Sequence, residues 1–136
     1  MNMKNSQKAK HILLCCALAV GIVSAVIIWQ SIRPSPGKPY EQITMEQAQE
    51  FMTYESDYIL ADISSEASFR KLHPDGAVNV PYDQFGDLIF TVFPDKEQQI
   101  YICGKKKKQR DRAASKLCVL GYSNVTEITD AYKNLK

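Results

Sequence analysis

Cys103 and the residues that follow it are the part of the sequence best suited to chemistry. Cys103 ends the apolar run YIC, and Gly104 and four consecutive lysines come directly after it. A thiolate is a strong nucleophile, and nearby cations or a helix N-terminus lower the pKa of a cysteine. Backbone N–H groups in a loop ahead of a helix also bind anions. The spacing indicates a nucleophile beside an anion site, although a run of like charges is more often a solvated turn.

The predicted anion site covers the loop after this cysteine and the start of the next helix. Its members are Gly104, Lys105, Lys106, Lys107, Lys108, Gln109 and Arg110. We expect their amides and cations to hold an anionic group next to Cys103.

Two other polar residues are candidates for supporting roles. Asp62 lies near the end of the apolar run YILADI, and we expect its carboxylate to bond loop amides. His73 begins the sequence HPDG, which favours a structural role in a turn over a catalytic one. Cys118 is interpreted as a small core residue of a helix, and a disulfide between it and Cys103 stays open in an oxidising compartment. The cysteines and histidines lack zinc-ligand spacing, so neither a metal nor another cofactor is expected.

Length and charge narrow the class of protein. The chain has 136 residues and a formal net charge of +2, which predicts one domain and does not suggest a nucleic-acid binder. Residues 12–29 form an uncharged apolar run, close to the shortest that spans a bilayer as a helix. Three lysines precede this run and two cations follow it, so we expect residues 1–11 in the cytoplasm.

The N-terminal run therefore predicts a single-pass membrane protein. We interpret residues 12–29 as a signal anchor, 30–39 as a proline-rich linker, and 40–136 as an extracytoplasmic domain. A cleaved signal peptide is the alternative, because Val23, Ser24 and Ala25 resemble a cleavage site.

The elements that position these residues alternate between helices and strands. Thr44 and Gln47 form a capping-box pattern that opens a helix over 45–54. The remaining patterns predict strands at 58–63, 77–82, 100–103 and 124–128, helices at 65–71, 83–93 and 109–120, and a short helix or tail from 129. This alternation predicts an α/β fold with a mostly parallel sheet. Ligands bind such sheets beyond the carboxyl ends of the strands, where Cys103 is expected to lie.

Across residues 40–128 the chain resembles a single-domain rhodanese. The resemblance is carried by Asp62, Phe69, His73, Gly76, Ala77, Asn79, Pro81, Cys103, Ala113, Ala114, Gly121, Tyr122, Asn124 and Val125. It implies a three-layer α/β sandwich with the cysteine at the base of a curled loop. It also implies a sulfurtransferase, in which Cys103 takes a sulfane sulfur from an anionic donor, becomes a persulfide, and passes the sulfur to a thiol acceptor.

Departures from the family pattern keep other functions open. Ser64 stands where the family usually has an arginine, and Leu72 where a glycine usually precedes the histidine. The loop after Cys103 is one residue longer than usual, as in related phosphatases and arsenate reductases, but Gln109 occupies the position of their arginine. The alternatives are a catalytically weak module that binds an anion or a protein partner, and an oxyanion reductase or phosphatase.

Overall fold

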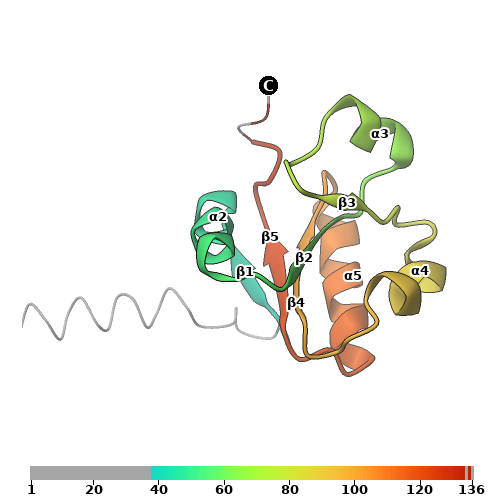
Figure 1. The fold of residues 1–136 in the computed structure, drawn as a ribbon. Helices are drawn as coiled ribbons and strands as arrows, with labels where there is room; N and C mark the ends of the chain where they lie inside the picture. The colour runs from blue at the N-terminus through green and yellow to red at the C-terminus, as the bar shows by residue number, and fades with distance from the viewer. Residues whose placement is uncertain (1–37, 134, 136) are drawn as a thin grey trace, which may run out of the picture. The chain divides into compact units, whose positions relative to one another are not determined.

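A parallel sheet forms the centre of the domain in the computed structural model, which describes residues 38–133 and 135 (Figure 1). The strand order is β1-β5-β4-β2-β3, and every neighbouring pair is parallel. The strands are β1 (Glu41–Ile43), β2 (Tyr58–Asp62), β3 (Val78–Asn79), β4 (Gln99–Cys103) and β5 (Val125–Ile128). The prediction of an α/β fold with a central parallel sheet is confirmed.

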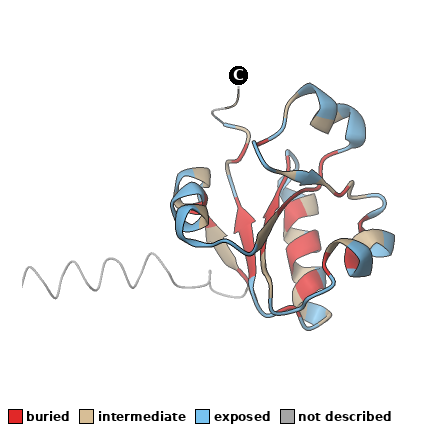
Figure 2. Ribbon diagram, viewed as in Figure 1, coloured by how far each residue is buried: buried red, intermediate tan, exposed pale blue. Residues whose placement is uncertain are grey.

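Helices cover both faces of this sheet. They are α2 (Met45–Tyr54), α3 (Glu66–Lys71), α4 (Phe85–Val92) and α5 (Lys107–Val119). Successive side chains of a strand point to opposite faces. In β4, Ile100 and Ile102 accordingly pack in the core cluster shared with α4 and α5, whereas Tyr101 and Cys103 pack in the cluster shared with α2. Figure 2 shows the buried residues gathered on the strands and along one side of α5.

The helix boundaries follow local signals closely. Thr44 caps α2, and its side chain and that of Gln47 form the predicted capping box. Gly121 follows α5 with a φ of +89°, a left-handed conformation that suits glycine. However, α5 begins at Lys107 rather than at the predicted residue 109, so Lys107 and Lys108 belong to its first turn.

One strand was not predicted. Strand β1 was missed, because three residues are too few to show an alternating pattern, and it exists through its parallel pairing with β5. After β5, a turn occupies residues 130–133 and the described residues there form no helix, which matches the predicted tail rather than the short helix. The predicted anchor at 12–29 lies outside the described residues. None of the helices within residues 38–133 has the length and apolar character that a bilayer span requires.

Candidate functional site

Asp62 and Cys103 lie side by side at the carboxyl ends of β2 and β4. They are direct register partners in the parallel ladder, and both are fully buried. Cys103 belongs to the core cluster on the α2 side of the sheet, with Leu60, Tyr101 and Ile128 among its members. The thiol therefore starts from a closed, mostly apolar environment.

Burial sets the protonation state of Cys103. Loss of solvent raises the pKa of its thiol, and the neighbouring Asp62 carboxylate raises it further. The Arg110 guanidinium opposes this shift but does not reverse it. The pKa thus moves in the direction opposite to that expected from the lysines, and the thiol in this arrangement is protonated at neutral pH.

Asp62 organises the backbone around the cysteine. Its Oδ1 accepts a 2.9 Å hydrogen bond from the Ser64 amide, which agrees with the prediction that this carboxylate bonds loop amides. Its Oδ2 accepts a hydrogen bond from the hydroxyl of Tyr132, which also lies 3.2 Å from Ser64 Oγ. Asn79 ties the same turn together, because its side-chain amide donates to the carbonyls of both Asp62 and Ser64.

Arg110 makes its hydrogen bonds inside the fold. Its Nε pairs with Glu127 Oε1 at 2.9 Å, and Glu127 is fully buried. Its Nη1 donates to the carbonyl of Gly104 at 2.7 Å, and its Nη2 donates to the carbonyl of Thr129 at 3.2 Å. Three of the five N–H donors of the guanidinium thus bind internal acceptors, and a role of Arg110 in holding an anion stays a prediction. The sequence pattern did not reveal Glu127 as the partner of Arg110. Glu127 is 17 positions away on β5, and only the packing of α5 against the sheet brings the two side chains together.

Gly104 joins Cys103 to the lysine run through a conformation that few residues tolerate. Its φ is +150°, and an added Cβ would lie 2.8 Å from Ile63 Cγ1. The next amide, of Lys105, donates a 3.3 Å hydrogen bond to Ser64 Oγ. The backbone after Cys103 is thus fixed by contacts with the β2–α3 connection.

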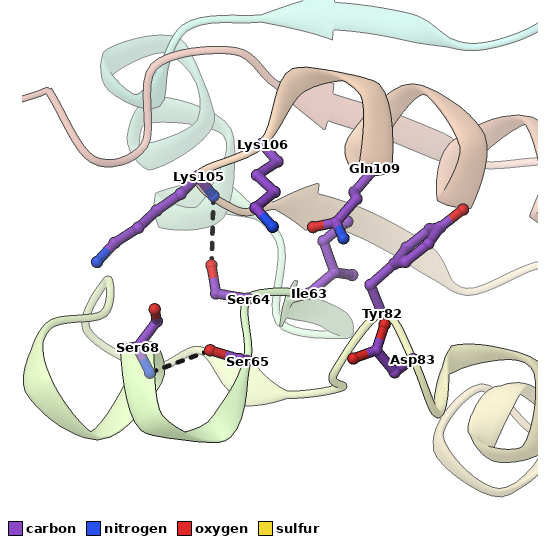
Figure 3. Close-up of a pocket in the computed structure, with 9 residues that line it drawn as sticks. All are labelled: Ile63, Ser64, Ser65, Ser68, Tyr82, Asp83, Lys105, Lys106 and Gln109. Carbon is purple, nitrogen blue, oxygen red and sulfur yellow. Dashed lines mark hydrogen bonds between the residues drawn. The ribbon is translucent and has the colours of Figure 1, made fainter.

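A pocket of about 220 Å³ opens above this backbone (Figure 3). The side chains of Lys106 and Gln109 extend toward serines of the β2–α3 connection, and Asp83 lies at the far side. Its lining residues are Ile63, Ser64, Ser65, Ser68, Tyr82, Asp83, Lys105, Lys106 and Gln109. Three of these were predicted site residues. The serines, Tyr82 and Asp83 were missed. They lie on segments far from Cys103 in the sequence, and a local sequence pattern does not show which distant segments meet in the fold.

The remaining predicted residues lie outside the pocket lining. Lys107 is 3.6 Å from Asp111 on the next turn of α5, and Lys108 is exposed. Cys103 does not line the pocket, whereas Ser64 and Lys105, which are hydrogen-bonded to each other, do. The thiol of Cys103 is therefore close to the pocket along the chain but is not accessible from it in this arrangement.

The start of α5 is electrostatically unfavourable as it stands. The cap residue, Lys106, makes no side-chain capping bond, and the first turn carries no acidic residue. A helix N-terminus carries a partial positive charge, so lysines there repel it. An anion bound at this end would accept hydrogen bonds from the first backbone amides of α5. It would also offset the positive charge of the helix N-terminus and of the lysines.

His73 and Cys118 are placed away from this chemistry. His73 Nδ1 lies 2.7 Å from the carbonyl of Phe69, and the two rings stack with centroids 4.0 Å apart. These contacts favour the structural role expected for His73. Cys118 packs against the core cluster on the α4 and α5 face, whereas Cys103 lies on the other face, and both thiols are free. The two cysteines are therefore not joined in this structure.

Comparison with known proteins gives the chain a family context. A family model described as "Rhodanese-like domain" matches residues 44–136. A search of the curated proteins finds no match. Among solved structures, the Alr3790 protein from Anabaena sp. superposes with a TM-score of 0.57 at 19% identity, covering 63% of this chain and 78% of that one. A thiosulfate sulfurtransferase from Pseudomonas aeruginosa gives a TM-score of 0.61 at 23% identity, covering 69% of this chain and 18% of that one.

Proposed function

The chain belongs to the rhodanese-like family, and from this premise we propose that its domain binds a small anion in the pocket beside Cys103. The observation that carries the proposal is the start of α5, where an uncapped helix N-terminus and lysine side chains border a cavity. Lys105 and Lys106 supply charge, and Ser64, Ser65 and Ser68 supply hydroxyl groups. An oxyanion such as sulfate or thiosulfate satisfies both kinds of donor.

The affinity of the full chain for sulfate tests this proposal. We expect calorimetry at low ionic strength to detect binding that weakens as salt rises, because exposed charges are screened. Lys105→Gln combined with Lys106→Gln should reduce the affinity by about tenfold or more, if each lost charge-assisted bond contributes roughly 1 kcal/mol.

A matched control comes from the same lysine run. Lys107→Gln combined with Lys108→Gln removes equal charge from the same helix end, but neither residue lines the pocket. This variant should keep most of the affinity. If both double variants lose the same affinity, the lysines act as a diffuse charge and the pocket is not the site.

Sulfur transfer through Cys103 is the second candidate function. Family membership and the position of Cys103 at the end of β4, directly before the pocket loop, favour it. In this step the Cys103 thiolate would attack the outer sulfur of thiosulfate, the S–S bond of the donor would break, and sulfite would leave. The resulting persulfide would pass its outer sulfur to a thiolate acceptor and regenerate the Cys103 thiolate. Burial of the thiol means that Cys103 must first be uncovered.

Mass spectrometry of the full chain after incubation with thiosulfate tests the second candidate. A gain of one sulfur atom on the peptide containing Cys103, absent from Cys103→Ser, is the expected result. A persulfide found only on another cysteine would rule out this role for Cys103. A phosphatase is disfavoured, because Arg110 is already bonded to Glu127 and Gly104 and does not line the pocket.

A further inference from the structure

We propose that Tyr132 couples occupancy of the anion pocket to exposure of Cys103, an inference that rests on the proposed anion binding. Tyr132 is partly buried in the turn after β5. It contacts both the core cluster that contains Cys103 and residues that line the pocket. Contacts with Asp62, Ser64 and Lys105 hold the Tyr132 side chain, which we call the cover of Cys103. An anion in the pocket competes for these contacts and loosens the cover.

On the cysteine side, Tyr132 is bonded to the residue beside the thiol. Its hydroxyl donates to Asp62 Oδ2, and Asp62 is the register partner of Cys103. The ring of Tyr132 packs against the core cluster that contains Cys103 and Ala131. Tyr132 is thus part of the layer that keeps solvent from Cys103.

On the pocket side, Tyr132 uses two groups that also line the cavity. The Lys105 ammonium lies 5.1 Å from the centroid of the Tyr132 ring, within the range of a cation–π contact. Ser64 Oγ lies 3.2 Å from the Tyr132 hydroxyl and accepts a hydrogen bond from the Lys105 amide. An anion that draws in the Lys105 ammonium and the Ser64 hydroxyl removes both contacts from Tyr132.

The turn that carries Tyr132 is anchored just before it. Asp130 Oδ1 accepts a 2.6 Å hydrogen bond from the Met45 amide at the start of α2, and the Thr129 amide donates to the carbonyl of Ile43. Ala131 is buried. The Lys133 amide also donates to the carbonyl of Asp130 at 2.9 Å, so the backbone is held on both sides of Tyr132. The contacts with Asp62, Ser64 and Lys105 therefore determine where the Tyr132 side chain lies, and the proposed opening is a rotation of this side chain.

Tyr132→Phe isolates the hydroxyl from the ring. The variant keeps the packing and the cation–π contact but loses both hydrogen-bonded partners. Tyr101→Phe is the matched control, because the Tyr101 hydroxyl donates to a carboxylate, Glu55 Oε2, at 2.7 Å on the same face of the sheet. Glu55 follows α2, away from the pocket lining.

The measurement is the alkylation rate of Cys103 by iodoacetamide, a neutral reagent, in the full chain. Peptide mass spectrometry separates Cys103 from Cys15, Cys16 and Cys118. We expect slow alkylation of the parent without sulfate and faster alkylation with saturating sulfate, at ionic strength matched with chloride. Tyr132→Phe should react about tenfold faster than the parent without sulfate and gain little from it, since a hydrogen bond to a charged group is lost. Tyr101→Phe should behave as the parent does.

Three results would overturn the coupling. If Cys103 of folded Tyr132→Phe reacts at the parent rate, Tyr132 does not hold the cover. If calorimetry shows that sulfate binds but the parent rate is unchanged, the coupling is wrong while the anion site stands. If sulfate does not bind, the coupling and the proposed function fail together. Should Tyr132→Phe unfold, Ser64→Ala removes one of the two partners and is expected to accelerate alkylation by a smaller factor.

Discussion

The Nη1 atom of Arg110 donates a 2.7 Å hydrogen bond to the carbonyl of Gly104, the residue that follows Cys103. The same guanidinium pairs with the fully buried Glu127 on β5. A single side chain therefore fixes the backbone beside the cysteine to the neighbouring strand. Arg110 therefore serves the fold, whereas the cations that line the pocket are Lys105 and Lys106.

Loss of Arg110 should destabilise the domain severely. Arg110→Gln removes the buried ion pair of Glu127, whose carboxylate keeps only its contacts with Gln42 and Lys38, and breaking a buried pair costs up to about 3–5 kcal/mol. Denaturant unfolding of the full chain measures the change. Arg112→Gln is the control, because Arg112 is exposed and should change the free energy of unfolding by less than about 0.5 kcal/mol. Equal stabilities for the two variants would contradict a structural role for Arg110.

Two glycine substitutions should have opposite effects. Gly104→Ala places a Cβ 2.8 Å from Ile63 Cγ1 at a φ of +150°, and we expect it to lower the free energy of unfolding by about 1–3 kcal/mol. Gly86→Ala lies within α4, where the nearest atom to the added Cβ is the flexible Lys116 Nζ. It should leave stability unchanged or raise it by up to about 1 kcal/mol, since alanine favours helices. Thermal unfolding of both variants measures whether each substitution raises or lowers stability. A Gly104→Ala variant as stable as the parent would show that the loop can adjust to the added Cβ.

Alkaline pH should destabilise the domain through Cys103. Its pKa is raised in the folded state, so the unfolded chain loses this proton first as the pH rises. The stabilisation is complete below the ordinary pKa of 9.0 and declines above it, by about 1.4 kcal/mol per pH unit for one thiol. Tyr132 contributes in the same direction only above its ordinary pKa of 10.0.

Denaturant unfolding between pH 8.5 and 10, with reductant present, measures this decline. Cys103→Ala should show a shallower slope than the parent over that interval. Identical slopes would mean that the thiol is not protected by burial in the folded state.

The N-terminal segment should hold the protein in a membrane. We expect the full chain to stay with the membrane fraction after alkaline extraction, because residues 12–29 form an uncharged apolar run. Protease added from outside the cell should digest the domain from residue 40 onward. A mature chain that begins near Val26 would instead show a cleaved signal peptide.

The sequence by itself determined the order of the elements from α2 to β5 and the position of Cys103 within it. The capping box at Thr44 and Gln47, the apolar runs of β2 and β4, and Gly121 after α5 are local signals, and the structure contains each of them. Such signals act over a few residues, because helix caps and strand alternation depend on neighbours along the chain. Alternation of these elements was also enough to predict a parallel sheet.

The tertiary structure alone decided which groups meet. Strand β1 exists only through its pairing with β5, and Arg110 turns inward because Glu127 lies on the adjacent strand. The register of β4 sends Cys103 to the α2 face, whereas the loop after it contributes Lys105 and Lys106 to the pocket. Neighbouring residues of a strand face opposite sides of a sheet, and the partners on each side come from distant segments. For this reason the run of charges beside Cys103 could be read from the sequence, but its separation from the buried thiol could not.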